Sequence, residues 1–205
     1  AGLRSGRGTS VSGDNVYEGD WKEDKKQGVG KLSIRGKLVY EGHWLADRRE
    51  GKGTAYYPFG QEYVGMWKDD RPNGTGTQYV VLAEGQTLKL YEGEMVNGKR
   101  HGKGVYYYAN HHGGEESDRY EGEFADDLFH GSGKLFYKNG AAMESKWVNG
   151  QRADPKMTLT VPSKKSDDGV ELEKASVTEM DMVEATHNEQ PTKPVFYSYI
   201  SYTFM

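Results

Sequence analysis

One short pattern recurs along this chain at a constant offset, and it limits the available folds more than any other feature. Five segments begin with tyrosine, carry glycine two residues later, and meet a Gly-x-Gly pair eleven residues after the tyrosine. The tyrosines are Tyr17, Tyr40, Tyr63, Tyr91 and Tyr120, and the pairs begin at Gly28, Gly51, Gly74, Gly102 and Gly131. Self-similarity of this length indicates a repeat architecture.

The spacing between copies shows where the pattern is interrupted. Successive tyrosines are separated by 23, 23, 28 and 29 residues. Because the offset to the glycine pair stays constant, the extra residues must follow that pair, near Leu82–Leu90 and Asn110–Asp118. We interpret both segments as insertions between repeats.

Both ends of the repeated region are atypical copies. A sixth copy begins at Met143 and keeps Trp147 and Asn149-Gly150, but it has lost the opening tyrosine and the glycine pair. At the other end, Arg4–Thr9 resembles Arg49–Thr54, so the chain opens on the second half of an earlier copy. Terminal units of a repeat array commonly differ because they cap it.

Alternation within each copy predicts β-strands. At a period of two residues, Tyr17, Gly19 and Trp21 share one face of a strand, whereas the intervening Glu18 and Asp20 share the other. The following strand places Gly28, Gly30, Leu32 and Ile34 together. We expect the polar run Glu23–Gln27 to form the turn between them, and Asn97-Gly98 is a strong turn signal in a later copy.

Glycine normally weakens a strand, so its recurrence needs a physical reason. We expect the glycines to leave room for a ring of the same or the neighbouring copy. A lone hairpin is marginal in water, so successive hairpins must pair, and two strands per copy give a rise of roughly 10 Å. The predicted fold is all-β: an elongated, single-layer stack of antiparallel hairpins followed by an irregular C-terminal tail.

Composition excludes several classes of protein. The 31 acidic and 27 basic residues nearly balance, so there is no electrostatic reason to expect nucleic acid or an anionic bilayer as the main partner. Cysteine is absent, which excludes disulfides and thiolate metal sites. No apolar run reaches the roughly 18 residues of a membrane span. The start has neither a signal-peptide pattern nor an initiator methionine, so we expect a fragment or a processed end.

A search for catalytic groups returns no constellation, and we predict that the chain is not an enzyme and holds no metal or cofactor. His101 and His130 precede glycine pairs and are interpreted as structural, and His111-His112 as part of a solvated loop. The glycine pairs are not phosphate cradles, because no helix follows them. One acidic residue per copy (Glu18, Glu41, Glu92 and Glu121) forms either a solvated ladder or an interaction face, and the sequence leaves both readings open.

The last quarter of the chain has a different character. Residues 154–190 are polar and suit a linker or a segment ordered by a partner, with one short helix expected over Val177–Thr186. Val195–Met205 holds five aromatic residues and no charge, which favours a strand. Such a strand needs a cover, so we expect it either to fold back on its own repeats or to add to a neighbouring protein.

The combination of Tyr-x-Gly-x-Trp and Gly-x-Gly at this spacing resembles the MORN repeat (membrane occupation and recognition nexus), over roughly Gly6–Gly150. The resemblance implies a twisted hairpin stack that serves as a scaffold. Members of this family occur in junctophilins, lipid kinases, a methyltransferase, and cytoskeletal and radial-spoke proteins, so the repeat leaves the function open. Met95 and Phe124, which stand where tryptophan is expected, depart from the pattern.

From this resemblance we predict a non-enzymatic scaffold in a cytoskeletal assembly of the cytoplasm, specifically the axoneme of a cilium or flagellum. The alternative is a phospholipid-binding module that attaches to a membrane at a junction or cortex. The expected partners are other proteins, with self-association left open, no nucleic acid, and membrane lipid in second place.

The predicted organisation has four parts: a remnant copy (1–16), the repeats (17–150), a polar linker (151–193) and an aromatic docking strand (194–205). The candidate protein-binding residues share an aromatic ring and lie in the repeats or the tail. They are Tyr17, Trp21, Tyr40, Trp44, Tyr63, Trp67, Tyr91, Tyr120, Phe196, Tyr197, Tyr199, Tyr202 and Phe204.

Overall fold

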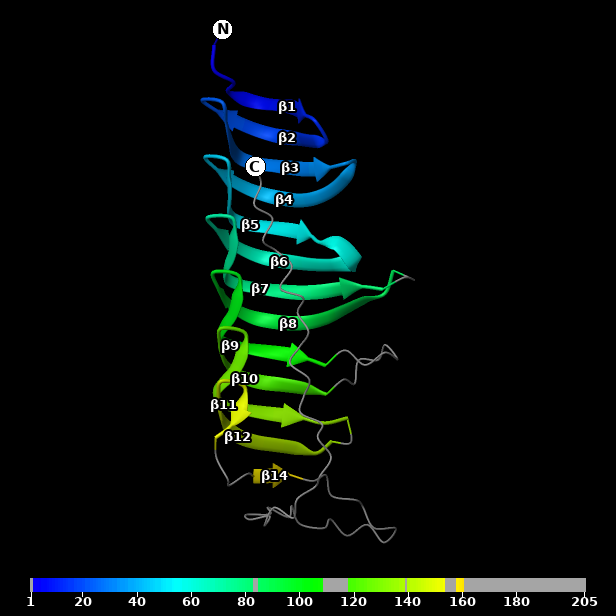
Figure 1. The fold of residues 1–205 in the computed structure, drawn as a ribbon, viewed down its shortest axis with the longest axis vertical. Coiled ribbons are helices and arrows are strands. Elements are labelled where there is room, and N and C mark those ends of the chain that lie inside the picture. Colours follow the sequence, from blue (N-terminus) through cyan, green and yellow to red (C-terminus); the bar gives the residue numbers. More distant parts are fainter. Residues whose placement is uncertain (1, 83–84, 109–117, 139, 154–157, 161–205) are drawn as a thin grey trace, which may run out of the picture.

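The protein forms one long open antiparallel sheet in which each strand pairs with the next along the chain (Figure 1). The computed structural model describes residues 2–82, 85–108, 118–138, 140–153 and 158–160. Within these ranges the sheet order runs from β1 to β13 in sequence, and β14 pairs with β12 beside that path. The only helical segment among the described residues is the one-turn 3₁₀ helix η1 (Pro58–Gly60).

Five repeats supply most of the sheet, each as one hairpin. They are β2 (Asn15–Lys22) with β3 (Lys25–Ile34), β4 (Lys37–Leu45) with β5 (Arg48–Tyr56), β6 (Gln61–Lys68) with β7 (Arg71–Val81), β8 (Thr87–Val96) with β9 (Lys99–Tyr107), and β10 (Arg119–Ala125) with β11 (Leu128–Phe136). The flanking strands are β1 (Gly6–Ser12), β12 (Ala142–Val148), β13 (Gln151–Arg152) and β14 (Thr158–Thr160). We number the repeats one to five in this order.

A row of glycines crosses the whole sheet at right angles to the strands. Each member is the register partner of the next: Gly8, Gly19, Gly30, Gly42, Gly53, Gly65, Gly76, Gly93, Gly104, Gly122 and Gly133. Ser145 on β12 ends the row. The expected reason for the glycines is confirmed, because the pattern's tyrosines lie over them. A Cβ added at Gly104, for example, would lie 2.5 Å from the Tyr91 hydroxyl oxygen.

The first glycine of each Gly-x-Gly pair has a different structural role from the glycines of the row, and the sequence analysis did not predict it. It lies in a β-bulge, where the register slips within each repeat directly after the glycine row. Gly102 and Gly131 illustrate the cause: their φ angles of 57° and 58° are in the left-handed region, which glycine adopts without strain. Bulges bend a strand and increase its twist, so the hairpin ends turn away from the plane of the sheet.

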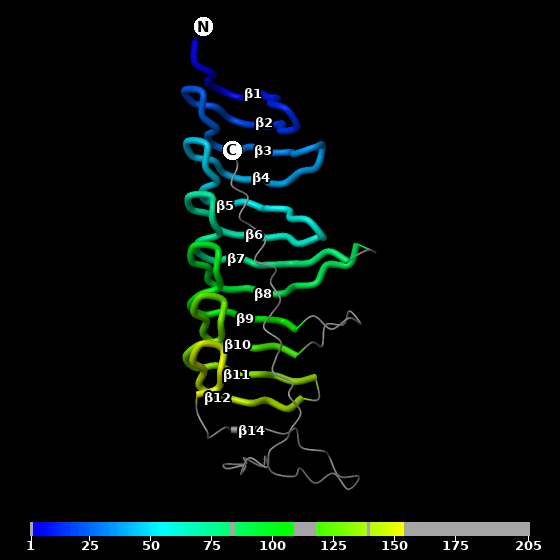
Figure 2. Tube along the Cα trace, in the orientation of Figure 1, coloured from blue at the N-terminus to red at the C-terminus, as the bar shows by residue number. Residues whose placement is uncertain are grey.

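We call those hairpin ends the tips. Each is a two-residue turn with positive φ at both positions, the geometry that suits the twist of a hairpin. The tips are Glu23-Asp24, Ala46-Asp47, Asp69-Asp70, Asn97-Gly98, Asp126-Asp127 and Asn149-Gly150. In Figure 2 they form a column of small loops along one side of the stack. The face that carries the pattern's tyrosines is called the inner face, and the opposite one the outer face.

The fold class predicted from the sequence is confirmed, with three differences of detail. The turn expected over Glu23–Gln27 contains only two residues, because Lys25–Gln27 already pairs with β2. The insertion near Leu82–Leu90 lengthens strands, since β7 and β8 have 11 and 10 residues. Strands β13 and β14 fall in the segment expected to be a linker, and both pair with β12. Residues 161–205, including the expected helix and the aromatic strand, lie outside the described residues, as do residues 109–117.

Replacing a glycine of the row with alanine should destabilise the protein by an amount that depends on the position. We expect Gly104→Ala to destabilise the protein by about 3 kcal/mol, because the Tyr91 ring would have to leave its site. Gly8→Ala is the matched control, since it belongs to the same row but a Cβ there meets nothing closer than 3.8 Å. Thermal unfolding followed by circular dichroism measures both variants. Equal melting temperatures for the two would show that the ring does not need the glycine.

Candidate binding surfaces

The tyrosines of the pattern are buried, and their rings cover the glycine row. The Tyr17 hydroxyl donates to the carbonyl oxygen of Asp20 at 3.1 Å, and the Tyr91 hydroxyl to that of Glu94 at 2.8 Å. Tyr40, Tyr63 and Tyr120 make the same bond to the third residue after them. All five side chains are at most 2% exposed. Each ring is thus held at both ends, by its backbone and by its hydroxyl.

The tryptophans join each repeat to the one before it. Trp44 stands edge-on to Tyr40 of its own repeat and to Tyr17 of the preceding one, with ring centroids 5.1 and 5.4 Å apart. Its indole N–H donates to the carbonyl oxygen of Gly30 at 3.1 Å, and Trp67 repeats the arrangement one unit later. Edge-to-face contacts of this kind stabilise a pair beyond its buried area. The rings therefore form one inter-repeat chain through the first three repeats and another from the fourth repeat to Trp147.

The departures from tryptophan weaken this chain locally. Met95 and Phe124 occupy the same buried place, but neither has an N–H to donate to the preceding repeat. Trp147 of the sixth copy keeps its ring contact with Tyr120, yet its Nε1 is buried without a hydrogen-bond partner among the described residues.

A second inter-repeat contact, the tip clip, was missed by the sequence analysis. The Asp127 carboxylate accepts from the backbone N and the Nε of Arg100, at 2.9 and 3.2 Å, and Arg100 Nη2 donates to the Asp127 carbonyl oxygen. Asp70 with Arg49 and Asp24 with Arg4 repeat the clip, and Asp47 accepts from the backbone N of Lys26. A basic residue two positions before three of the five glycine pairs, with aspartate at the next tip, is the signal that could have revealed it.

Two junctions lack the clip, and at each of them both the basic residue and the tip aspartate are replaced. At the junction of the third and fourth repeats, Pro72 has neither an N–H nor a cation, and its tip partner is Gly98, which has no carboxylate. After the fifth repeat, Phe129 takes the place of the cation and stacks on Tyr120 at 3.8 Å, opposite Gly150. Only the backbone bond from each tip glycine to the preceding repeat is kept.

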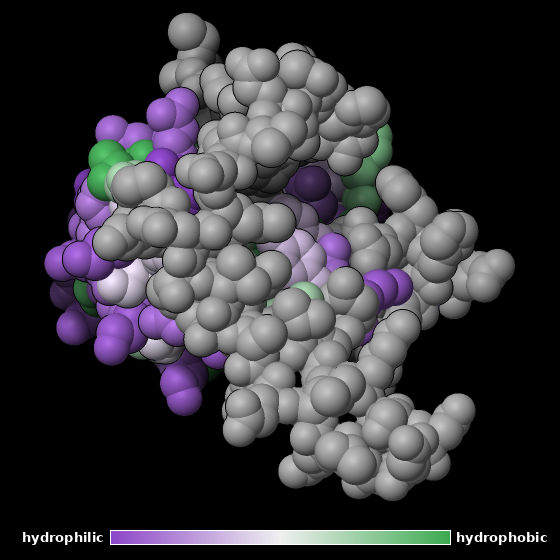
Figure 3. All heavy atoms as spheres, turned by 90° about the horizontal axis from the view of Figure 1, so that it is seen from below, coloured by the Kyte–Doolittle hydropathy of each residue, from purple (hydrophilic) through white to green (hydrophobic). Residues whose placement is uncertain are grey.

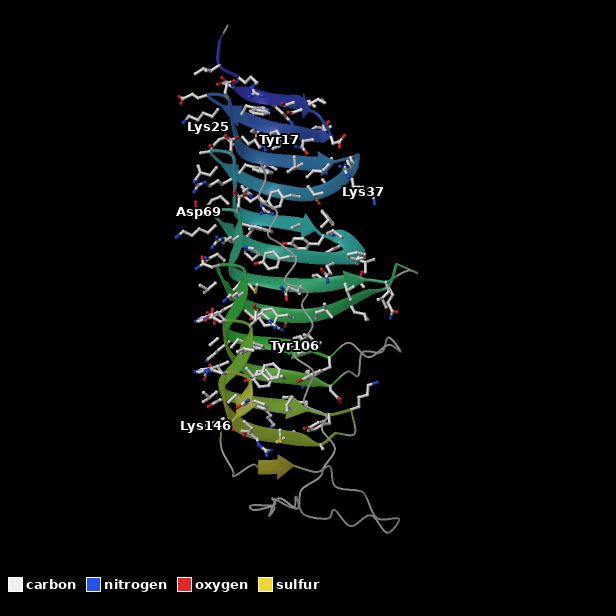
Figure 4. All side chains as sticks on the ribbon, in the orientation of Figure 1. Tyr17, Lys25, Lys37, Asp69, Tyr106 and Lys146 are labelled. Carbon is white, nitrogen blue, oxygen red and sulfur yellow. The ribbon has the colours of Figure 1, made fainter. Side chains whose placement is uncertain are left out.

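On the outer face, the acidic row expected from the sequence is present and partly paired. Glu41 contacts Lys31 at 3.0 Å, Glu92 contacts Lys89 at 2.6 Å, and Glu121 contacts Arg119 at 2.6 Å. The Tyr56 hydroxyl also donates to Glu41, and these contacts hold the pKa of the Glu41 carboxyl below its usual range. Hydrophilic side chains also gather along the tip side, at the left of Figure 3. In Figure 4, Asp69 marks a tip, Lys25 the start of β3 next to the first tip, and Tyr17 the inner face.

Five stretches of the chain match the MORN repeat, over residues 17–35, 40–60, 63–79, 91–113 and 120–142, which together make up about half of the chain. The chain belongs to the MORN-repeat family. MORN repeats are generally protein- or lipid-binding modules and are not a known enzyme family. No curated protein matches the chain.

The candidate ring residues of the MORN repeats are all found in the interior. Tyr17, Tyr40, Tyr63, Tyr91, Tyr120, Trp21, Trp44 and Trp67 are between 0 and 9% exposed, so they position a surface rather than form one. The other candidates, Phe196, Tyr197, Tyr199, Tyr202 and Phe204, lie outside the described residues.

The polar groups considered for chemistry are spread along the stack. His101 is exposed, and His130 is partly buried with its Nδ1 unpaired among the described residues. The described part of the chain contains no cluster of three or more histidines and carboxylates that could hold a metal. His111-His112 falls outside it. Nothing helical in that part is long and apolar enough to cross a membrane.

The tip clip predicts a junction-specific loss of stability. We expect Asp127→Ala to cost about 1–2 kcal/mol, because the Arg100 side chain is only 1% exposed and would keep its charge without the carboxylate. Asp24→Ala is the control, with a smaller expected change, because its partner Arg4 is 53% exposed. Urea unfolding compares the variants, and an unchanged midpoint for Asp127→Ala would mean that the clip contributes nothing.

The buried phenols predict a loss of stability in alkali. Burial, with smaller contributions from Asp20 and Asp47, raises the pKa of Tyr17 to about 12, whereas phenols of the unfolded chain titrate near pH 10. The folded state therefore holds this proton more tightly, so the stabilisation is complete below about pH 10 and is lost as pH rises through about 12. Melting temperatures across this range measure the effect. Tyr17→Phe, which cannot ionise, should show a shallower fall, and equal slopes would contradict the assignment.

Proposed function

We propose that this chain is a non-enzymatic scaffold that holds other proteins together in a cytoskeletal assembly. The observation that supports it is the continuous sheet from β1 to β12, which rings and tip clips reinforce on both sides of the junction between the third and fourth repeats. Such a body keeps surfaces at fixed distances along its length. Repeat proteins commonly use extended surfaces of this kind to bind partners.

In this proposal the buried rings hold the surface, and partner choice belongs to the parts that differ between repeats. These are the outer-face residues and the insertions at Leu82–Leu90 and Asn110–Asp118. The aromatic segment 194–205 is proposed as a further contact, either with the repeats of its own chain or with a neighbouring protein. The choice of the cytoplasm, the cytoskeleton and the axoneme of a cilium or flagellum rests on the family resemblance alone.

Membrane attachment is the other function that MORN repeats suggest, and the charges at the tips argue against it. Of the basic groups that a bilayer would need, Arg48 and Arg49 contact Asp69 and Asp70, at 2.6 and 3.1 Å. Lys99 and Arg100 are likewise paired with aspartates of the next tip. These four basic side chains therefore stand beside carboxylates, which reduces the attraction of the tip row for anionic lipid.

Detergent extraction of cells that express the tagged chain tests the proposal. We expect the tag to stay with the detergent-insoluble cytoskeleton, and in ciliated cells with the axoneme. Deleting Val195–Met205 then asks whether the aromatic segment is needed for retention. Release by detergent, together with flotation on vesicles that contain phosphoinositides, would contradict the scaffold and favour the membrane.

A further inference from the structure

The outer face of the third repeat differs from that of every other repeat. In the first, second, fourth and fifth repeats the residue between the tyrosine and the glycine is glutamate, whereas the third repeat has Val64. The residue after that glycine is polar or charged elsewhere, but here it is Met66. Val64 is 42% exposed. Because the inner-face residues Tyr63 and Trp67 are unchanged, packing of the stack does not explain the substitution.

These two side chains border a shallow hollow of about 660 Å³ on the outer face. Its floor is the bare backbone of the glycine row at Gly53, Gly65 and Gly76. Thr54, Thr75 and Thr77 line the hollow around Val64 and Met66, together with Lys52, the register partner of Met66, and Glu92, the register partner of Thr77. The hollow therefore presents two apolar side chains at positions where the other repeats carry polar or charged ones, with one cation and one carboxylate beside them.

A basic notch follows directly along the same hairpin. The next outward position on β6 after Met66 is Lys68, and Asn73 and Arg71 come after Thr75 on β7. Together with residues of the neighbouring tips, they line a second hollow of about 610 Å³. Its lining residues are Arg48, Lys68, Asp69, Arg71, Asn73 and Asn97. Three basic groups and one carboxylate leave it with a positive charge.

At two junctions an ion pair joins the first residue of a hairpin's second strand to the next tip, and the notch lies between them. One repeat earlier Arg48 contacts Asp69 at 2.6 Å, and one repeat later Lys99 contacts Asp126 at 3.3 Å. Arg71 occupies the same position between them, but the tip residue that faces it is Asn97. Within the described ranges, neither Arg71 nor Lys68 makes an ion pair. The site therefore has a cation without the tip carboxylate of these two ion pairs, as Lys25 opposite Ala46 has in the first repeat, but here the cation adjoins the apolar hollow.

We propose that the outer face of the third repeat binds a short segment of a partner protein that carries an apolar side chain and, a few residues away, a carboxylate. The apolar side chain enters the hollow beside Val64 and Met66, and the carboxylate pairs with Arg71 and Lys68. This site specifies the partner chemistry of the scaffold and so rests on the proposed function.

The surroundings of the notch favour a single carboxylate over an anionic bilayer. The neighbouring tips carry Asp47, Asp70, Asp126 and Asp127, so a flat anionic surface that reached Arg71 would also meet these acids. A side chain from a protein segment reaches the notch alone. The hollow next to it adds apolar contact that a lipid headgroup cannot use.

The test begins with selection of a random-peptide library on the full-length chain, followed by fluorescence anisotropy with the enriched synthetic peptide. We expect the enriched peptides to combine an apolar residue with a nearby aspartate or glutamate. Lys68→Glu with Arg71→Glu should weaken binding by about tenfold or more. Val64→Glu with Met66→Glu, which copies the outer residues of the fourth repeat, should do the same without disturbing the fold. Added salt should weaken the binding.

The matched control is Lys22→Glu with Lys25→Glu, the same two positions in the first repeat, where the outward neighbours are Glu18 and Asp20. We expect this variant to bind the peptide as the unmodified chain does. Enriched peptides without an acidic residue, or equal binding by the third-repeat and first-repeat charge variants, would overturn the proposal.

Two other occupants would also overturn it. Residues 166–189 of this chain hold eight acidic residues and one lysine, so competition by a synthetic peptide of that sequence would assign the site to the chain itself. Phosphoinositide vesicles that bind only while Lys68 and Arg71 are basic would assign it to a membrane. If no peptide binds the site but the chain stays in the cytoskeletal fraction, only this inference is wrong. If a peptide binds the site but detergent releases the chain, only the scaffold proposal is wrong.

Discussion

The contact between a tyrosine ring and a pair of glycines is the interaction on which the rest of this structure depends. The ring lies over its own strand, so its Cβ and its hydroxyl are both held, and the space it occupies exists only because the backbone beneath carries no side chain. A single-layer sheet has no second layer to bury its apolar surface. Placing aromatic rings against bare backbone supplies a core within one layer, which explains how a chain with only 35% hydrophobic residues forms an extended fold.

Burial of the rings creates a requirement at the tips. The bulge after the glycine row turns each hairpin end, and the turned ends must then be held to one another. The tip clip meets this need through a backbone carbonyl, a carboxylate and a cation, and the same cation also lies over the next ring, as Arg49 does over Trp67 at 4.4 Å. Where proline or phenylalanine replaces the cation, glycine replaces the aspartate. This paired change avoids leaving a tip carboxylate without the cation that it contacts in the other repeats.

The sequence was sufficient to predict the fold, because the constant offset between Tyr17 and Gly28 recurs in every repeat and admits one pairing of strands. It also predicted that the glycines make room for rings. It did not reveal that Gly28 and Gly30 have different roles, because a bulge depends on register and both residues read alike in a linear pattern. The partners of the tip clip are 20 to 27 residues apart, so they come into view only once neighbouring repeats are aligned in space. The sequence also did not reveal the exposed surface at Val64, because a valine in a strand is ordinarily interpreted as a core residue.

Differences among repeats are informative because every copy packs against its neighbours in the same way. Tyr63, Gly65 and Trp67 keep the third repeat within the pattern on its inner face, whereas Val64, Met66 and the Arg71–Asn97 position depart from it on the outer face and at the tip. The departures adjoin the junction that also lacks the tryptophan and the clip, at Met95 and Pro72. Loss of the ring contact and of the clip removes two kinds of stabilising contact from this junction, although the lengthened β7 and β8 pair across it. A sequence under selection for the stack alone would restore them, so their concentration around one hairpin is better explained by a demand from outside the stack, in the form of a surface that a partner recognises.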